Sequence, residues 1–390
     1  MKSNKEFAIL SSIGIIMVVI AHCDGVINIL SNFFPYNSFF MPMFMFISGY
    51  FFKDKNVENF KNFKIYLRKK SINLLLYYFI WNIIYGIIRI ILYKLNLDNT
   101  LVKINIRSLI IIPFIDGQQY SINSPAWFVP TLFTIEIGFC VIRKIQILCK
   151  EKLTWLSLVL FLIANCMSVF ISMEFEYSNI VIPILKFFFF VFFFQLGKIY
   201  KDKIEVFDNK ISSVIVIIIT VLINLICLKL YKDLSFSSLY NMRRFKDICV
   251  PCYIPIITGI TGIWFWLRIS KNIASVIKEN SFLIKISNNT KPIMTHHIFC
   301  MLCINIVLYY TRNIIGLSDF NVEIFMKNGG WYRYHADLKQ LEVIYIVFGI
   351  YGSIKINEFE KFIVKKFKKI YGYYKENLKI DRGGKINEKI

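Results

Sequence analysis

The chain holds four histidines, and three of them lie in apolar sequence of the kind that crosses a membrane. His22 ends the run FAILSSIGIIMVVIAH, whereas His296 and His297 stand in KPIMTHHIF. A neutral imidazole is the side chain best suited to take a proton near neutral pH, and polar groups in hydrocarbon are rarely kept without a use. We therefore predict that His22 is a general base inside the protein, although a hydrogen bond to a neighbouring helix is the alternative.

Asp24 follows His22 by two residues and is the candidate partner of that base. On a continuous helix its carboxylate would point away from the imidazole, because residues two apart do not share a helix face. A break of the helix at Gly25 would allow Asp24 to orient the ring. We predict a catalytic pair of His22 and Asp24 on that condition.

Two CxxC pairs suggest a metal site, because cysteine thiolates at this spacing bind zinc. The pairs are Cys249 with Cys252 and Cys300 with Cys303. Both lie within or at the edge of hydrophobic segments, where cysteine behaves as a small apolar residue. We expect no metal. Glu136, another notable acid in an apolar segment, is predicted to be a hydrogen-bonding partner between helices.

The elements that position these residues are expected to be membrane helices. Of 390 residues 56% are hydrophobic and 38 are Phe, and the mean hydropathy is +0.54, which exceeds what a soluble domain can bury. Apolar windows of spanning length fall at 7–30, 36–52, 72–93, 126–142, 153–172, 180–197, 211–230, 249–268, 292–311 and 341–354. The sequence thus predicts an all-α polytopic integral membrane protein with about ten transmembrane helices.

The basic residues predict the orientation of this bundle. With a cytoplasmic N-terminus, 33 of the 47 lysines and arginines fall on the cytoplasmic side, 11 outside and three within spans. Positive residues accumulate on the cytoplasmic side, so both termini are expected there. The net charge of +22 is then a membrane property, and we expect no nucleic-acid partner. Of the basic residues in spans, Arg89 and Lys186 are expected to face the bundle interior or to extend to an interface.

No linker or repeat divides the chain, so residues 1–355 are expected to form one transmembrane domain and 356–390 a basic amphipathic cytoplasmic tail. In NEFEKFIVKKFKKIYGYY, apolar residues recur at helical spacing opposite lysines. This pattern is typical of a helix that lies on anionic membrane lipids, and a disordered tail is the alternative. The 104–115 segment is short enough to be a re-entrant piece.

Five blocks carry a resemblance to a known family. They are VVIAH ending at His22, FMFISGYFF, YLRKKSINLLLYYFIWNIIYG, SPAWFVPTLF and ISNNTKPIMTHHIF. With these blocks in this order, the chain resembles the acyltransferase-3 superfamily of membrane-bound sugar O-acetyltransferases, including fucose 4-O-acetylase-like proteins. It departs from the family pattern at Ser11, where many members have arginine, and at Asn73 and Tyr77 in the basic loop.

The resemblance implies a bacterial cytoplasmic membrane enzyme that uses cytoplasmic acyl-CoA, with acetyl-CoA as the donor. Arg68, Lys69 and Lys70 supply cations for the phosphates of that donor, and the alternative is that they only set the topology. At Ser11 and Asn73 the role of the family's basic residues is either carried out differently in this chain or shared by Arg68, Lys69 and Lys70. His296 and His297 are expected near the donor entry.

The acceptor implied by the resemblance is a cell-surface polysaccharide or a lipid-linked saccharide. Sugar faces stack on aromatic rings and hydroxyls need polar partners, so the predicted outer segments supply Tyr120, Asn123, Trp127 and Trp331 as candidate binding residues. Each aromatic residue is equally consistent with the interfacial belt of a membrane protein.

At about 1.5 Å per residue, His22 lies more than about 20 Å from the start of its span. His296 and His297 lie close to the start of theirs, so we expect no compact cluster of the three. The prediction is a membrane O-acyltransferase with His22 deep in the bundle. The alternative is a transporter or flippase of a polyprenyl-linked saccharide, and a non-catalytic scaffold is the third reading.

Overall fold

The computed structural model describes residues 4–23, 32–35, 37–115, 117, 120–150, 153–231, 234, 242, 250–334 and 340–384, the last range without side chains after residue 366. All regular elements in these ranges are helices, and none is a strand. Six helical stretches are long and apolar enough to cross a membrane: Phe60–Lys94, Ser121–Leu148, Leu153–Glu174, Ile182–Asp208, Ser213–Leu230 and Thr290–Thr311. The chain is thus a multi-pass membrane protein, as predicted.

Each predicted apolar window overlaps one long helix or the short α2. The helices are α1 (Lys5–Ala21), α2 (Phe40–Tyr50), α4 (Tyr77–Lys94), α6 (Phe128–Leu148), α7 (Leu153–Glu174), α8 (Ile182–Ile199), α10 (Ser213–Leu230), α11 (Ile254–Val276), α13 (Thr290–Thr311) and α15 (Gln340–Gly384). Shorter elements join them: η2 (Asp54–Val57), α3 (Phe60–Lys70), η3 (Ser71–Leu76), η4 (Arg107–Ile111), α5 (Ile112–Ile115), η5 (Ser121–Trp127), η6 (Tyr200–Ile204), α9 (Glu205–Asp208), α12 (Phe282–Ser287) and α14 (Val322–Asn328).

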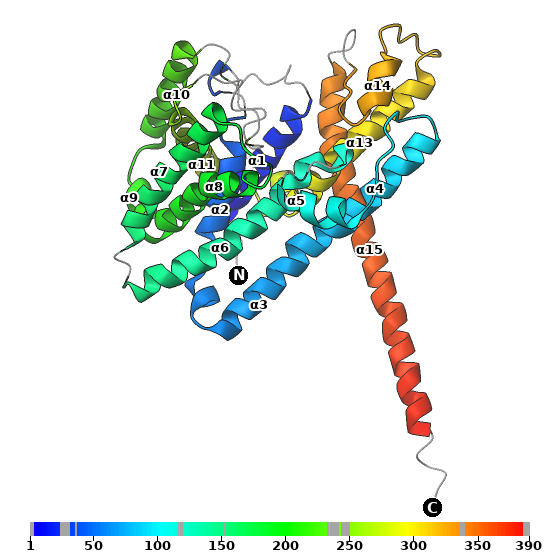
Figure 1. The fold of residues 1–390 in the computed structure, drawn as a ribbon, viewed down its shortest axis with the longest axis horizontal. Helices are drawn as coiled ribbons and strands as arrows, with labels where there is room; N and C mark the ends of the chain where they lie inside the picture. The colour runs from blue at the N-terminus through cyan, green and yellow to red at the C-terminus, as the bar shows by residue number, and fades with distance from the viewer. Residues whose placement is uncertain are drawn as a thin grey trace, which may run out of the picture.

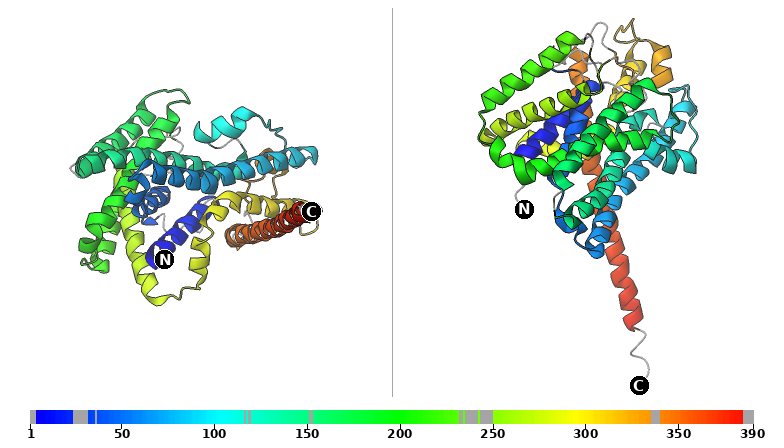
Figure 2. Two further views of the ribbon diagram at one scale, coloured as in Figure 1. Left: turned by 90° about the horizontal axis from the view of Figure 1, so that it is seen from below. Right: turned by 60° about the vertical axis from the view of Figure 1, so that its left-hand side comes forward.

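Helix α1 lies inside the bundle, between α2, α11, α12, α13 and α15 (Figure 2). The Asn4 side chain caps it by accepting a hydrogen bond from the Phe7 amide at 3.3 Å, which satisfies one of the free donors of the first turn. An aliphatic run then continues to Ala21, and His22 is the C-cap residue. The predicted base therefore stands at the end of a central helix.

Helices α2 and α8 pack at very short range beside α1 because each has a glycine at the contact. A Cβ atom on Gly49 would lie 1.9 Å from the Phe194 carbonyl oxygen, and one on Gly197 would lie 2.0 Å from that of Phe46. Small residues allow this approach, which is a common way to pack membrane helices. The pair forms a rigid wall next to α1.

Helix α13 begins inside the bundle. The hydroxyl of Ser12 donates to the Leu283 carbonyl oxygen in α12 at 2.5 Å, and the Ser11 and Thr290 hydroxyls lie 3.1 Å apart. The short helix α12 is thus packed on α1, and α13 begins beside the second turn of α1. This starting depth decides which residues of α13 meet the end of α1.

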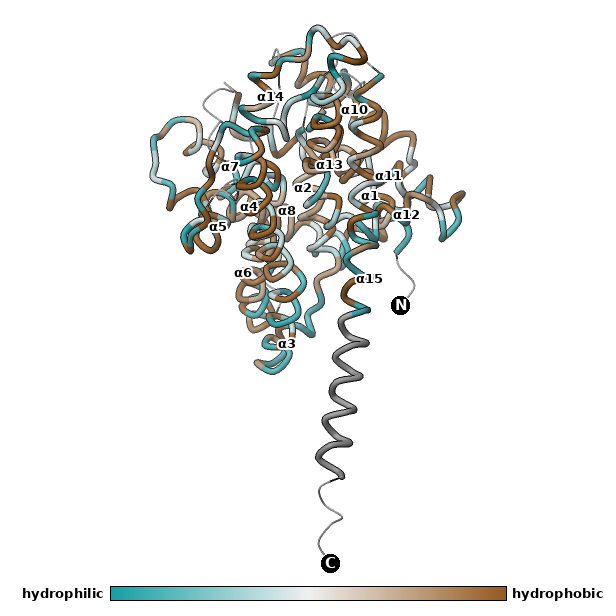
Figure 3. The backbone as a smooth tube through the Cα atoms, turned by 90° about the vertical axis from the view of Figure 1, so that its right-hand side faces the viewer, coloured by the Kyte–Doolittle hydropathy of each residue, from teal (hydrophilic) through white to brown (hydrophobic). Residues whose placement is uncertain are grey.

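The basic segment before the third window is itself helical. Helix α3, η3 and α4 form one continuous helical stretch, Phe60–Lys94, and Figure 3 shows a hydrophilic α3 passing into a more hydrophobic α4. We call the end of the bundle with the N-terminus, α3 and the extension of α15 the basic end (Figure 1). Ser71–Leu76 is a π-helical stretch, a local widening that is frequent at functional sites.

Helix α15 continues past the bundle as a projecting rod (Figures 1 and 2). It runs without a break from Gln340 to Gly384, so the backbone has no discontinuity at the predicted boundary after residue 355. The division into a transmembrane domain and a tail stays a prediction.

The two charges predicted to face the interior or an interface lie in the interior. Arg89 and Lys186 are both buried. Arg89 pairs with Asp98 at 2.5 Å and donates to the Ser121 hydroxyl, and the Lys186 ammonium lies over the Trp127 ring. Each cation therefore links its helix to η5, in agreement with the rule that charges within spans face partners in the bundle.

Candidate active site

The imidazoles of His22 and His297 are in contact. Nε2 of His297 lies 3.1 Å from Nδ1 of His22, and Nδ1 of His297 lies 2.7 Å from the Ile293 carbonyl oxygen. His297 is fully buried, whereas His22 is half-buried. The three histidines were predicted to form no compact cluster. Two of them meet, so the estimate of depth behind that prediction is wrong for His297.

The starting depth of α13 explains this correction. The sequence-based estimate assumes that each apolar segment begins at the membrane surface. Because α12 is packed on α1, Thr290 instead lies beside Ser11. Seven residues of α13, about 10 Å of helix, then separate Thr290 from His297 and its contact with His22.

Two residues of the segment after α14 contact His22. The Nε atom of Arg333 donates to the His22 carbonyl oxygen at 2.9 Å, where a cation stabilises the end of a helix. The Trp331 ring lies edge-on to the His22 ring at 5.1 Å, and its Nε1 donates to the Ser121 carbonyl oxygen. The His22 residue is thus held by its backbone carbonyl group and faced by an aromatic ring.

His296, the preceding residue, belongs to a different cluster. Its Nδ1 lies 2.7 Å from the Tyr85 hydroxyl, and its Nε2 lies 3.0 Å from the Tyr77 hydroxyl and 3.1 Å from the Glu360 carboxylate. The Trp81 ring stands edge-on to it at 4.3 Å. His296 is therefore tied to α4 and to the extension of α15.

A hollow of about 720 Å³ opens at the basic end between α2, η2 and the continuous helix of α3 and η3. Its lining includes Lys53, Lys55, Lys69 and Lys70, with Glu136 and Asn73 on the wall. We call it the lysine pocket. Lys70 pairs with Glu136 at 2.5 Å, which agrees with the prediction that Glu136 is an interhelical partner. Arg68 is exposed and does not line the pocket.

Two of these lysines are presented by the anchored turn η2. Arg143 donates to both carboxylate oxygens of Asp54 at 2.8 and 2.9 Å, and Lys198 lies 3.1 Å from the same group. Burial raises the pKa of the Asp54 carboxyl, but the bonds from Arg143 and the charge of Lys198 outweigh it and hold the pKa below its usual value. The turn that carries Lys53 and Lys55 is therefore fixed.

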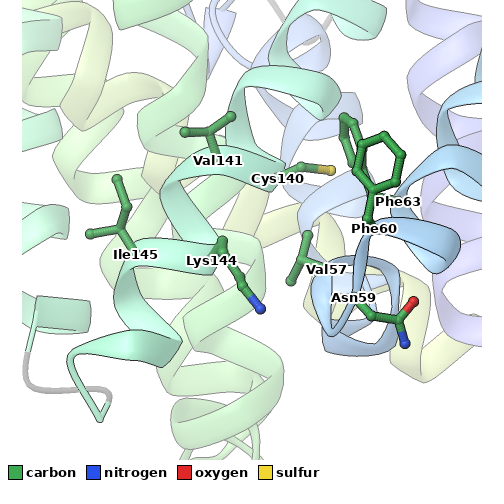
Figure 4. A pocket seen from close by; sticks show the side chains of 8 residues that line it. All are labelled: Val57, Asn59, Phe60, Phe63, Cys140, Val141, Lys144 and Ile145. Atoms are coloured by element: carbon green, nitrogen blue, oxygen red, sulfur yellow. The ribbon is translucent and has the colours of Figure 1, made fainter.

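A second hollow, of about 360 Å³, lies between α3 and α6 and is mostly apolar (Figure 4). It is lined by Val57, Asn59, Phe60, Phe63, Cys140, Val141, Lys144 and Ile145. The one cationic residue in this lining, Lys144, donates to the Glu58 carbonyl oxygen at 2.9 Å. Phosphates need several donors or cations, so this apolar pocket suits them less well than the lysine pocket does.

The predicted acceptor residues lie on or next to η5, apart from Trp331. Tyr120 is buried with its hydroxyl 3.2 Å from that of Ser108, and Trp127 packs against Phe190 beneath the Lys186 ammonium. Asn123 is 2% exposed, and within the described ranges its amide atoms have no hydrogen-bonding partner. Of the four, Trp331 is the one seen in contact with His22.

Some predicted residues cannot be placed. Asp24 and Cys249 lie outside the described residues, so the pairing of Asp24 with His22 stays a prediction. In the part of the chain that the structure describes, no group of three or more His, Cys, Asp or Glu side chains is arranged to hold a metal ion.

The described part of the bundle thus holds both a half-buried imidazole, His22, and a cationic hollow, the lysine pocket. A comparison with protein families shows what kind of enzyme this is. The model of an acyltransferase domain matches residues 7–293. The chain belongs to the acyltransferase 3 family. Membership implies acyltransferase activity, with donor and acceptor left open. Searches of curated proteins and of solved structures each gave no match.

The matched region of this acyltransferase includes His22 and the lysine pocket but ends before His296. No pattern in the sequence predicted the contacts of Tyr85, Arg333 and Glu360 with the histidines, or the position of Lys53 and Lys55 in the lysine pocket. In the sequence, Glu360 stands out as an acid in a basic segment, and Arg333 as a cation two residues after Trp331. Neither signal identifies a partner without the fold.

Proposed function

We propose that this acyltransferase is an O-acetyltransferase of the bacterial cytoplasmic membrane. It transfers an acetyl group from cytoplasmic acetyl-CoA to a hydroxyl of a cell-surface polysaccharide or a lipid-linked saccharide. The observation that carries the proposal is the half-buried His22 imidazole between His297 and Trp331. A base in this position reaches both a buried donor and a ring-stacked acceptor.

In this arrangement ten helices span the membrane: α1, α2, α4, α6, α7, α8, α10, α11, α13 and α15. Both termini are cytoplasmic, which follows from the segregation of basic residues. The lysine pocket and the extension of α15 then lie on the cytoplasmic side. The lysines that follow residue 355 contact anionic lipid headgroups where α15 leaves the bundle.

The lysine pocket receives the phosphates of the donor. Four lysines and one glutamate give its lining a formal net charge of +3, and lysine binds phosphate as a point charge. Because Lys70 is shared with Glu136, Lys53, Lys55 and Lys69 contribute most. Arg68 lies outside the lining and acts at longer range.

The pocket wall leads toward the histidines. Lys291 donates to the Asn73 carbonyl oxygen at 2.8 Å and lies over the Tyr77 ring, and the Tyr77 hydroxyl contacts His296. The pantetheine arm of the donor follows this wall past His296, and the thioester reaches His22 and His297.

The transfer is a single exchange of an acyl group. The His22 imidazole removes the proton of the acceptor hydroxyl while the hydroxyl oxygen attacks the thioester carbonyl carbon. A carbon–oxygen bond forms and the carbon–sulfur bond breaks. The CoA thiolate leaves and takes up the proton that His22 held, so the products are an ester and the free thiol. If Asp24 reaches the ring, it supports the transient imidazolium.

The acceptor enters from the side of the bundle opposite to the lysine pocket. Trp331, 37% exposed, offers a ring face or edge to a sugar next to His22. Asn123 offers an amide whose buried atoms are unpartnered within the described ranges, and such groups gain from a substrate hydroxyl. Tyr120 and Trp127 shape the η5 wall behind them.

Mass spectrometry of surface glycans from cells with the gene, without it, and with His22→Ala tests the proposal. We expect O-acetyl groups in the first sample and not in the other two. The competing transporter of a polyprenyl-linked saccharide predicts another result. In that case deletion removes the whole glycan, and the glycan that remains in the other strains has unchanged acetylation.

A further inference from the structure

We propose that His297 is a positioning residue that fixes the tautomer of His22 and leaves Nε2 of His22 as the basic nitrogen. The inference rests on the proposed function, in which His22 is the base, and it assigns His297 a role other than binding the donor. It follows from two hydrogen bonds and the chemistry of the imidazole ring.

The first bond sets the proton on His297. Its Nδ1 lies 2.7 Å from the Ile293 carbonyl oxygen, one turn earlier on α13. A carbonyl oxygen can only accept a hydrogen bond, so Nδ1 carries the hydrogen. Both residues are fully buried, and the helix backbone keeps the acceptor in place. The tautomer of His297 is therefore determined by its own helix.

The second bond transmits this choice to His22. A neutral imidazole with hydrogen on one nitrogen accepts at the other, so Nε2 of His297 is an acceptor. It lies 3.1 Å from Nδ1 of His22. Nδ1 of His22 must then donate, and Nε2 of His22 carries no hydrogen. That lone pair is directed away from His297, and no side chain of the described residues bonds to it, although the Val18 carbonyl oxygen one turn earlier on α1 lies beside the ring. It can therefore take a proton from a substrate.

The surroundings favour two neutral rings. Across the described residues, no carboxylate contacts either His22 or His297, and the nearest charged group at His22 is the Arg333 guanidinium bound to its carbonyl oxygen. A further buried cation without a counter-ion is costly. With the partners that the described residues supply, the neutral pair, with one hydrogen between the rings, is therefore the resting state.

His296 cannot replace His297 in this role. Its two nitrogens contact Tyr85, Tyr77 and Glu360, and these contacts hold its ring against α4 and α15. The assignment therefore distinguishes two consecutive histidines, and His296 provides a matched control on the same helix.

Nitrogen-15 NMR of histidine-labelled protein in lipid nanodiscs reads the tautomers directly. Only four histidines contribute signals, and single substitutions assign them. In the unaltered protein we expect hydrogen on Nδ1 and none on Nε2 of His22. His297→Gln should preserve this state, since its amide oxygen can accept near the position of Nε2. His297→Asn is too short to do so and should give a mixture, whereas His296→Asn should leave His22 unchanged.

Acetyl transfer by the same variants completes the test. His297→Asn should lower kcat by roughly 10²-fold, the lower end of what a positioned base supplies, with the KM for acetyl-CoA unchanged. His297→Gln should stay within several-fold of the unaltered enzyme. Equal losses for Gln and Asn, or hydrogen on Nε2 of His22 in the unaltered protein, would overturn the inference.

Failure of the proposed function looks different. If His22→Ala retains full transfer while the NMR spectrum shows hydrogen on Nδ1 of His22, the tautomer assignment stands and the catalytic role of His22 is rejected. Size-exclusion profiles of every variant in detergent verify that each is folded.

Discussion

His296 and His297 are consecutive residues of α13, yet they take part in two clusters of different character. His297 contacts a backbone carbonyl and the His22 ring, next to a guanidinium and the exposed edge of Trp331. His296 contacts two tyrosines and the Glu360 carboxylate. Successive residues of a helix point about 100° apart, so one ring faces α1 and the other faces α4 and α15. The two residues are of the same type, so the difference between them comes from the partners that each meets on the facing helix.

The two ends of the bundle also differ, because the basic end is expected in the cytoplasm and the opposite end outside. This difference would be lost if both ends lay on one side of the membrane. Cysteines introduced one at a time at Lys61 and Asn313, both exposed, test this in a background in which the exposed Cys149 is replaced by Ser. We expect labelling of Lys61→Cys from the cytoplasm alone and of Asn313→Cys from outside alone, because basic segments stay inside.

A cysteine in 356–366 should behave like that at Lys61. Labelling of this segment from outside would reverse the orientation and remove the lysine pocket from the side that holds acetyl-CoA.

His22→Ala should have the largest effect on chemistry. Loss of general-base assistance lowers kcat by about 10²- to 10⁴-fold, and the donor KM should change little because the lysine pocket is intact. Transfer by purified enzyme with labelled acetyl-CoA measures both constants. Near-normal kcat in correctly folded protein would show that the His297 cluster is not the reaction centre.

The lysine pocket should affect donor affinity instead. Lys55→Gln with Lys69→Gln should raise the KM for acetyl-CoA several-fold without a matching fall in kcat, because two phosphate-binding charges are lost. Lys70 is left in place, since its removal would leave Glu136 buried without a counter-ion.

Two single variants serve as controls for that pair. Arg68→Gln changes an exposed residue outside the pocket, and Lys144→Gln changes the cation of the apolar pocket. If either control raised the KM as much as the pair does, the lysines of the pocket would not bind the donor specifically. They would then only set the membrane topology.

Glu360→Gln should have the smallest effect and separates the two histidine clusters. The amide can still bond to Tyr77 and His296 but loses the charge, so we expect about 1 kcal/mol lower stability and at most a few-fold higher donor KM. Thermal unfolding and kinetics measure these. Glu358→Gln, in an exposed pair with Lys285 and Lys355, is the control and should be nearly silent. A fall in kcat as large as that of His22→Ala would show that the clusters around His296 and His297 act together in the chemical step.

Much of the fold could be predicted because membrane helices are specified locally. Apolar length, helix period and charge asymmetry are readable in one segment at a time. The same holds for single groups: His22 at the end of its run, the lysines of α3, and the partner role of Glu136. Depth along a span was the weak step, since it assumes that every helix starts at the membrane surface. The packing of α12 on α1 breaks this assumption for α13.

The sequence by itself determined that this chain is a helical membrane protein with a titratable ring ending its first apolar segment. The tertiary structure decided which partners meet. Contact between His22 and His297 joins residues 275 apart in the chain, and that between His296 and Glu360 joins residues 64 apart. Such contacts depend on the starting depth and rotation of each helix, which are set by serine hydroxyls, close glycines and buried ion pairs on neighbouring elements. The starting depth and rotation of a helix cannot be read from its own sequence, because the groups that set them lie on other segments of the chain.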